Sequence, residues 1–202
     1  MWIKPILCAG LLTASSAASA ATYTLDFTGS GGIPDSFGDN AEADLSYRGI
    51  TGTGFGDVAT SGGTSFWGSG YGDLNGAIWA DNDGAHGEIR IAAVNPLAMV
   101  SIDSFDMGGW SANEAASWYI YDLNWTLVGS GTGIAPNTGA HLSVLSGASA
   151  IGGLIFQWGD DAWDVGVENF TYTVSSSTVP VPASVLLMGG ALAGLAALRR
   201  RG

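Results

Sequence analysis

Short segments in which apolar and polar residues alternate, separated by glycine-rich turns, fill the middle of this chain. The alternation is clear over residues 22–27, 88–91, 154–158 and 170–174. A period of two places successive side chains on opposite faces of a β-strand. Turn segments lie between these stretches, at 29–32, 61–63, 81–84, 129–131 and 152–153. The chain contains 32 glycines and no amphipathic helical stretch of ten or more residues stands out, so an all-β fold is predicted.

The spacing of these segments favours one all-β architecture. Residues 118–128 have the pattern of a β-hairpin that bends near 122–124, whereas 113–117 could form a turn. Many short strands joined by turns are typical of a two-sheet antiparallel sandwich, and a jelly roll is the expected topology. We assign this β-sandwich domain to residues 21–174, enough for one domain with a substantial core.

The first 20 residues have the composition of a secretory signal peptide. Lys4 gives a positively charged start, an apolar stretch covers 5–12, and small residues follow. That stretch is much shorter than the roughly 20 residues that span a bilayer, which disfavours a transmembrane anchor. Ala18 and Ala20 fit the small-x-small pattern of a signal-peptidase site, and we expect cleavage after Ala20 or Ala21.

Cysteine is confined to the predicted signal peptide. Cys8 is the single cysteine of the chain, and residues 5–7 lack the small residue that a lipoprotein cleavage site has beside its cysteine. Cleavage as predicted leaves the exported chain without cysteine. Disulfides, thiol nucleophiles and thiolate metal sites are then excluded.

The C-terminal region has four parts in a fixed order. A polar spacer at 175–178 precedes a proline-containing motif, an uncharged stretch at 184–198 and a basic end. The motif consists of Val179, Pro180, Val181, Pro182 and Ala183, and the basic end of Arg199, Arg200 and Arg201. The prolines hold the backbone extended and prevent an earlier helix start. We expect a short transmembrane helix in the uncharged stretch, with the arginines stopping transfer and keeping the C-terminus cytoplasmic.

This order of parts resembles the VPLPA-CTERM branch of the PEP-CTERM sorting signals, which occur on exported proteins of Gram-negative bacteria that make extracellular polysaccharide. Val181 stands where the named motif has leucine. The resemblance covers 179–202 and implies that an exosortase, a membrane-embedded transpeptidase-like enzyme, recognises the motif and removes the tail. It implies a protein of the cell surface or extracellular space, held transiently in the inner membrane by its tail. A simple tail anchor is the alternative.

Charge is distributed very unevenly along the chain. All 18 acidic residues lie between the two terminal segments, together with only two of the six basic residues, Arg48 and Arg90. This central part therefore carries a formal charge of −16. Such a surface repels nucleic acid and anionic lipid and attracts cations. A nucleic-acid partner is excluded, and the acidity otherwise suits an extracellular protein or serves solubility alone.

The order of segments in the second half resembles the jelly-roll bodies that PEP-CTERM proteins often carry, which are similar to galactose-binding-like carbohydrate modules. A strand at 99–105, the hairpin at 118–128 and an apolar strand at 153–158 precede a closing strand. In such modules the closing strand often opens with an acidic residue and asparagine before an aromatic, as at 168–170 here. The resemblance implies a galactose-binding-like sandwich.

Residues for hydrolytic catalysis are scarce. A Ser-His-Asp triad needs a histidine, and His86 and His141, the only two, have no nucleophile-elbow context. Two isolated histidines without cysteine also make a poor zinc site. Paired carboxylates could hydrolyse glycosides at separations of about 5–10 Å, but among 18 acids some pair meets that distance by chance. We therefore expect no enzymatic activity.

Two acidic segments could supply oxygen ligands to calcium, which takes about six to eight oxygens. The first contains Asp73, Asn75, Asp81, Asn82 and Asp83, and the second Asp160, Asp161, Asp164 and Glu168. Neither has the spacing of an EF-hand. Turns rich in aspartate and asparagine are also ordinary in β-proteins, because these side chains cap turns. A structural calcium ion is the one candidate cofactor.

Tryptophan is abundant after the signal peptide, where seven of the eight tryptophans of the chain lie. Flat aromatic faces flanked by aspartate and asparagine are suited to gripping sugar rings. Trp67, Trp110 and Trp163 lie in glycine- or acid-rich segments expected to be loops, which makes them a candidate sugar platform. Trp118 and Trp158 lie in strand-like runs and are expected in the core. Burial is the alternative for every one of them.

Three functions are compatible with these features. The leading hypothesis is a non-enzymatic, exported surface or matrix protein that binds extracellular polysaccharide. The second is a surface glycosidase or lyase that uses the paired carboxylates between Asp160 and Glu168. The third is an adhesin that binds other proteins, and its binding would not depend on Trp110 or Trp163.

Overall fold

The structure is a computed structural model, and it describes residues 19–29, 31–52 and 54–175. Within this part of the chain the backbone forms strands, turns and bends, and no helix. The strands in chain order are β1 (Ala20–Leu25), β2 (Gly31–Gly32), β3 (Ala43–Ile50), β4 (Thr60–Gly62), β5 (Thr64–Trp67), β6 (Ala77–Ala80), β7 (His86–Ala93), β8 (Met99–Gly109), β9 (Glu114–Asp122), β10 (Leu127–Ala135), β11 (Leu142–Ile151), β12 (Gly153–Gly159) and β13 (Val165–Ser175). The predicted all-β class is confirmed.

Several predicted features of the terminal segments fall outside the described residues. They include Ala18 of the cleavage site, the sorting motif at 179–183 and the arginines at 199–201. In the described ranges no helix has the length and apolar character needed to cross a bilayer. The signal peptide, the spacer beyond Ser175 and the sorting tail stay predictions.

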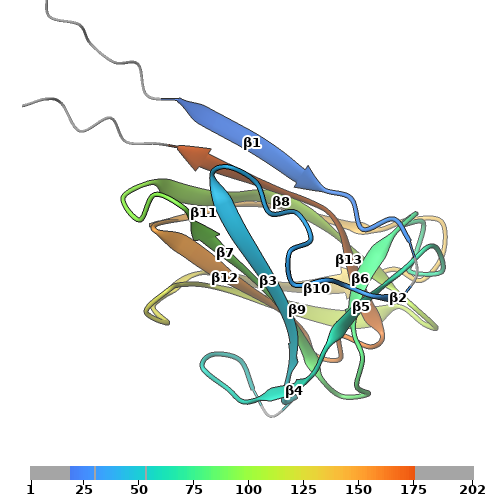
Figure 1. The fold of residues 1–202 in the computed structure, drawn as a ribbon. Coiled ribbons are helices and arrows are strands. Elements are labelled where there is room, and N and C mark those ends of the chain that lie inside the picture. The colour runs from blue at the N-terminus through green and yellow to red at the C-terminus, as the bar shows by residue number, and fades with distance from the viewer. Residues whose placement is uncertain (1–18, 30, 53, 176–202) are drawn as a thin grey trace, which may run out of the picture. The chain divides into compact units, whose positions relative to one another are not determined.

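Two antiparallel sheets contain the strands (Figure 1). Sheet A has the order β11-β8-β13-β6-β5-β2, and β1 also pairs with β13. Sheet B has the order β10-β9-β12-β7-β3-β4. From β7 onward the chain crosses repeatedly between the two sheets, which is the connectivity of a jelly roll. The predicted two-sheet jelly-roll sandwich is confirmed.

Apolar side chains on the facing sides of the sheets form the core. Ile89 and Ile91 of β7 and Phe156 and Trp158 of β12 come from sheet B, and all four are fully buried. Phe105 of β8 meets Phe156 from sheet A, with ring centroids 4.6 Å apart. Burying each such side chain contributes about 1.5–3 kcal/mol relative to exposure. Because a slip by one residue would turn these side chains outward, the core fixes the strand register.

Strand β13 connects the two parts of sheet A. Its C-terminal half pairs with β1, with Ala20 opposite Ser175, and its N-terminal half borders β6 through Val167 opposite Ile78. The start of β1 and the end of β13 therefore lie side by side (Figure 1). Ala20 and Ala21, which flank the predicted cleavage site, are the first two residues of β1. Cleavage after Ala20 would leave all but one residue of this strand.

Two local expectations differ from the structure. Residues 113–117, expected as a turn, largely belong to β9, where Glu114 pairs with Ala135 across the β9–β10 ladder. The closing strand begins earlier than expected, so Glu168 and Asn169 lie inside β13 rather than at its opening. They form a bulge, with Asn169 at a φ of 50°. Asparagine tolerates this left-handed conformation because its short polar side chain can hydrogen-bond locally.

Candidate functional site

Five aromatic side chains line a pocket of ≈ 260 Å³. They are Trp67, Tyr71, Trp79, Trp110 and Trp163. The fold thus brings together the three tryptophans predicted as a sugar platform from separate parts of the sequence. Trp67, Trp110 and Trp163 are 44, 40 and 38 % exposed, respectively, so the alternative that they are buried in the core is wrong.

Trp67, expected in a loop, is instead the last residue of β5. The strand register places Trp67 and Trp79 on the outer face of sheet A. In the β5–β6 ladder Trp67 lies opposite Ala77 and Trp79 opposite Ser65. The intervening Ile78 belongs to the core between the sheets. Because successive residues of a strand face opposite sides, both indoles project away from that core.

Tyr71 reaches the pocket from the loop between β5 and β6, which folds back onto sheet A. Beneath it, Gly108 of β8 and Gly166 of β13 face each other in the strand register. A Cβ at Gly166 would lie 2.8 Å from the Tyr71 ring, and one at Gly108 would lie 2.4 Å from the Tyr71 carbonyl oxygen. Only glycine leaves enough room at both positions, so this pair forms the seat of Tyr71.

Hydrogen bonds hold the two loop tryptophans in place. The main-chain amide of Trp110 donates to the carbonyl of Asp164 at 2.9 Å. The Tyr71 hydroxyl donates to the carbonyl of Trp163 at 2.6 Å, and the amide of Trp163 donates to Oδ1 of Asp161 at 2.9 Å. These contacts tie the β5–β6 loop, the end of β8 and the β12–β13 loop into one rim.

The aromatic rings meet at steep angles. Trp67 and Trp110 lie edge to face, with centroids 6.0 Å apart and planes at 86°. Trp79 and Trp163 are arranged similarly, at 4.7 Å and 89°, and Tyr71 leans on Trp110 at 5.1 Å and 48°. The rings therefore form walls around a space, in contrast to the flat platform expected from the sequence.

One of the side chains that line the pocket has an unpaired donor. Among the described residues, Nε1 of Trp79 is a buried side-chain nitrogen without a hydrogen-bond partner. Leaving a buried donor unsatisfied costs about 1–3 kcal/mol.

Carboxylates flank Trp163 in the β12–β13 loop. Burial raises the pKa of Asp164, and the negative charges of Asp161 and Asp83 raise it further. Asp161 is held in place by two main-chain amides, those of Gly84 at 3.0 Å and Trp163 at 2.9 Å. The field beside the pocket therefore opposes an anionic ligand.

The fold regroups the two acidic segments predicted to bind calcium. Asn75 of the first segment lies beside Glu168 of the second, whose Oε2 accepts from the Asn75 amide at 3.0 Å. Asp73 lies 2.8 Å from Nδ1 of His141. Asp83 of the first segment lies near the carboxylates of the β12–β13 loop.

The remaining predicted calcium ligands take part in hydrogen bonds with neighbouring segments. The amide of Asp81 donates to the Gly63 carbonyl at 3.1 Å, and the side chain of Asn82 donates to the Ser61 carbonyl. Asp160 places its main-chain carbonyl beside His86. In the described ranges no group of three or more histidine, cysteine, aspartate or glutamate side chains is arranged to hold a metal ion. Calcium stays a prediction from the sequence.

The two histidines have different surroundings. His86 is buried, and its ring nitrogens lie 3.1 Å from the main-chain carbonyls of Gly54 and Asp160. His141 lies between two carboxylates, with Asp73 at 2.8 Å and Asp106 at 3.6 Å. Among the described residues, the hydrogen-bond partners named here for the two histidine rings are main-chain carbonyls and carboxylates, and none is the serine hydroxyl that a Ser-His-Asp triad would need.

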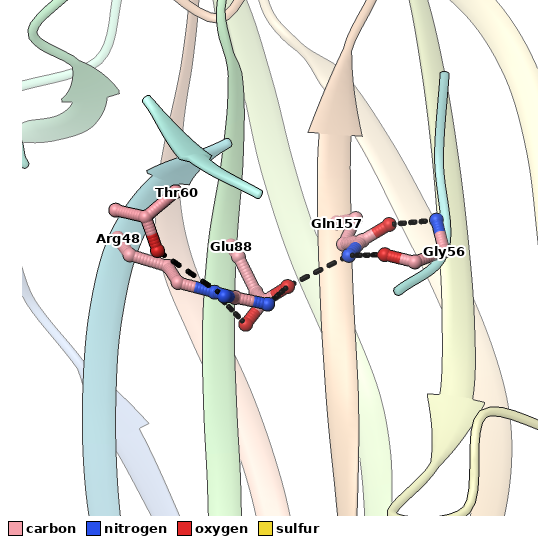
Figure 2. Close-up of polar contacts among 5 residues, drawn as sticks. All are labelled: Arg48, Gly56, Thr60, Glu88 and Gln157. Carbon is pink, nitrogen blue, oxygen red and sulfur yellow. Dashed lines mark hydrogen bonds and ion pairs between the residues drawn. The ribbon is translucent and has the colours of Figure 1, made fainter. Parts of the chain in front are cut away.

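A cluster of polar side chains lies on the outer face of sheet B (Figure 2). No sequence motif predicts this cluster. Arg48, Glu88 and Gln157 are direct cross-strand neighbours on β3, β7 and β12. Arg48 binds Glu88 through Nε at 2.6 Å and Nη2 at 3.0 Å, and Gln157 donates to Glu88 at 2.7 Å. Gln157 also exchanges two hydrogen bonds with the main chain of Gly56, and Arg48 contacts Thr60. The cluster anchors the β3–β4 connection to the sheet.

Tyr71 and Trp79 complete the pocket, yet the sequence did not mark them as site residues. Trp79 lies in a strand-like run, whose outward side cannot be identified without knowing which face the second sheet covers. The sequence did contain an indirect indication for Tyr71, since glycines at 108 and 166 in otherwise apolar strands suggest the close approach of another segment.

No protein-family model and no curated protein matches the chain. Among solved structures, the chain is similar to an arabinose-bound GH51 α-L-arabinofuranosidase, at 10 % identity over 65 % of this chain and 27 % of that one, with a TM-score of 0.36. It is similar to the Podospora anserina GH26-CBM35 β-(1,4)-mannanase at 11 % identity, over 80 % and 29 % of the chains, with a TM-score of 0.34. It is also similar to TmCBM61 in complex with β-1,4-galactotriose, at 9 % identity over 65 % of this chain and 83 % of that one, with a TM-score of 0.29. The chain spans less than a third of the first two structures, and likenesses at this level carry no argument about binding or activity.

Proposed function

We propose that this protein is an exported, non-enzymatic protein of the cell surface or extracellular matrix whose β-sandwich binds polysaccharide at the aromatic pocket. The observation that carries the proposal is the convergence of Trp67, Trp110 and Trp163 on one solvent-open pocket. Three large aromatic side chains held open to solvent forgo burial in the core, which is unfavourable unless a ligand covers them.

The chemistry of the pocket supports a sugar ligand. Indole rings offer large apolar faces to the C–H groups of a sugar ring, and indole N–H groups offer donors to its oxygens. The volume of ≈ 260 Å³ is slightly below the roughly 300–1,000 Å³ typical of small-ligand sites. A pocket of this size suits a single sugar unit of a longer chain.

Export and surface sorting form the second part of the proposal. They rest on the predicted signal peptide and on the resemblance of 179–202 to a sorting tail. Intact-mass measurement of the protein isolated from its native cells tests this part. We expect an N-terminus at Ala21 or Thr22 and a C-terminus near the motif at 179–183, and a chain still ending at Gly202 would contradict processing by an exosortase.

A glycan array probed with the full chain tests polysaccharide binding. We expect binding to a limited class of sugars, and at least a tenfold weaker signal for Trp110→Ala and Trp163→Ala, because hot-spot aromatics contribute about 2 kcal/mol or more. Trp125→Ala, which removes an indole from the β9–β10 turn outside the pocket, is the matched control. A blank array, or binding that survives loss of Trp110, would reject the pocket as a glycan site. Capture of a protein partner independent of both tryptophans would instead support the adhesin hypothesis.

A further inference from the structure

The distribution of charge around the aromatic pocket narrows the class of sugar that the pocket would take. All five lining side chains are uncharged. The only arginines between the terminal segments are Arg48 and Arg90, which lie on β3 and β7 of sheet B, and Arg48 is bound to Glu88 at 2.6 Å. In the described ranges, therefore, sheet A and its loops contain no lysine or arginine that could pair with an acidic sugar.

The cationic group nearest to the β5–β6 loop is already engaged. His141 lies between Asp73 of that loop and Asp106 of β8, at 2.8 and 3.6 Å. Two carboxylates face this one imidazole, so its charge, when present, is compensated locally. It is not available to attract an anionic ligand to the pocket.

Negative charge accumulates near Tyr71 and Trp163, two of the lining residues. Asp161 and Asp164 flank Trp163 in sequence, and the main chain of Asp164 is hydrogen-bonded to the amide of Trp110. Burial and the charges of Asp161 and Asp83 raise the pKa of Asp164, which indicates that these carboxylates repel one another. A bound cation would relieve this repulsion.

The arrangement of the aromatic rings also favours a ligand with a positive charge. In the perpendicular pairs Trp67–Trp110 and Trp79–Trp163, the edge of one ring meets the face of the other, and all four rings line the pocket. The face of an aromatic ring is its negative side and attracts cations within about 6 Å of the centroid. Walls of this kind enclose a compact positive group better than a single flat face does.

We propose that the pocket selects protonated amino sugars, that is, hexosamine units with a free ammonium group, as occur in partly N-deacetylated polysaccharides. This inference rests on the proposed function, polysaccharide binding at the same pocket. The ammonium group would lie against the indole faces on the side of Asp161 and Asp164, and the sugar ring would stack on the remaining aromatic surface. Uronic acids and other anionic sugars would be excluded by the same charges.

Calorimetric titration of the full chain with matched oligosaccharides tests the inference. The titrants are a β-1,4-linked glucosamine hexamer, the N-acetylglucosamine hexamer of the same linkage, a galacturonic acid hexamer and choline. At a mildly acidic pH and low salt we expect the glucosamine hexamer to bind about tenfold more tightly than its acetylated counterpart, the effect of one good cation–π contact. Added salt should reduce the difference because part of the attraction is screened.

Variants separate the pocket from the overall negative charge of the protein. Trp110→Ala should abolish binding of the glucosamine hexamer although the net charge is unchanged. Asp164→Asn should reduce the preference for the free amine several-fold, whereas Asp44→Asn, the same charge change on an exposed residue of β3 in sheet B, should leave it unchanged. Trp163→Phe, which keeps an aromatic face, serves if Trp110→Ala does not fold, and should weaken binding only partly.

The outcomes distinguish the inference from the function on which it rests. Equal binding of the two hexamers, lost in Trp110→Ala, would overturn the amino-sugar preference and leave glycan binding intact. Absence of any Trp110-dependent binding would overturn both. Binding that persists in Trp110→Ala would indicate bulk charge attraction, and choline binding as tight as the hexamer would show that the sugar is irrelevant. Either result would overturn the inference.

Discussion

The Tyr71 hydroxyl lies 2.6 Å from the main-chain carbonyl oxygen of Trp163 and donates a hydrogen bond to it. This bond connects the β5–β6 loop with the β12–β13 loop, two parts of the chain that are far apart in sequence. Burial raises the pKa of Tyr71, and the charges of Asp164 and Asp161 add to the effect. The phenol therefore remains a donor throughout the ordinary pH range, and one wall of the pocket is held against another.

Replacing Tyr71 by phenylalanine should remove this bond and keep the ring contact with Trp110. We expect the free energy of unfolding to fall by about 1 kcal/mol, the usual net contribution of one hydrogen bond. Ligand affinity should fall as well, since Trp163 loses its anchor. Chemical denaturation and ligand titration measure the two effects. Tyr121→Phe, on β9 of sheet B, is the control, and an equal loss of affinity there would contradict the assigned role of Tyr71.

The glycine seat beneath Tyr71 provides a second prediction. A Cβ at Gly166 would lie 2.8 Å from the Tyr71 ring and 2.8 Å from the Cβ of Ala77. Gly166→Ala should therefore push the loop outward and destabilise the fold by about 1–3 kcal/mol, as overpacking commonly does. Gly32→Ala, where a Cβ would meet nothing within 4 Å, is the matched control. Thermal unfolding compares them, and similar melting temperatures for both variants would argue against the seat.

The fold was predictable because its determinants are local. Alternation at 22–27 and 170–174 identifies β1 and the end of β13, and the turn near 122–124 identifies the β9–β10 hairpin. The core position of Trp158 follows from the same pattern and is confirmed. The turn expected at 113–117 was wrong because pairing with β10 outweighs the weak local preference of that segment.

The composition of the site was predictable only in part. Trp67, Trp110 and Trp163 stand in glycine- or acid-rich segments, which indicates exposure even when their neighbours in space are unknown. The proximity of Asn75 to Glu168 was not predictable, because it depends on the β13 register and on the path of the β5–β6 loop. Contacts between segments far apart in sequence are set by tertiary packing, which periodicity does not encode.

The polar cluster on sheet B makes a strong prediction about stability. Glu88 is 2 % exposed and is held by Arg48 through two hydrogen bonds. Arg48→Met should lower the free energy of unfolding by about 3 kcal/mol, because it leaves a buried carboxylate without its counter-charge. Adding Glu88→Gln should recover part of that loss, since an amide needs no counter-charge. Arg90→Met, on the same strand as Glu88, is the control and should change stability by about 0.5 kcal/mol or less.

Denaturation in urea measures all three variants at one pH. A double variant less stable than Arg48→Met alone would show that the carboxylate is stabilised by something other than Arg48. A loss in Arg90→Met as large as that in Arg48→Met would show that the cluster has no special role.

The pair of His141 with Asp73 predicts a dependence of stability on pH. The hydrogen bond to Asp73 raises the pKa of His141, and the charges of Asp106, Asp73 and Glu168 raise it further, while burial opposes them. The folded protein thus holds the proton more tightly than the unfolded chain. The stabilisation is fully present below the unfolded pKa of about 6.5 and is lost as the pH rises through the higher folded pKa.

Both side chains of the pair are at least a third exposed, so the contribution is small, about 1 kcal/mol or less. We expect the free energy of unfolding to decline between about pH 6 and pH 8 in the unmodified protein and to decline less in His141→Gln, which cannot be protonated. Urea denaturation at intervals across this range measures both slopes. Identical slopes in the two proteins would remove the proposed role of the His141–Asp73 pair.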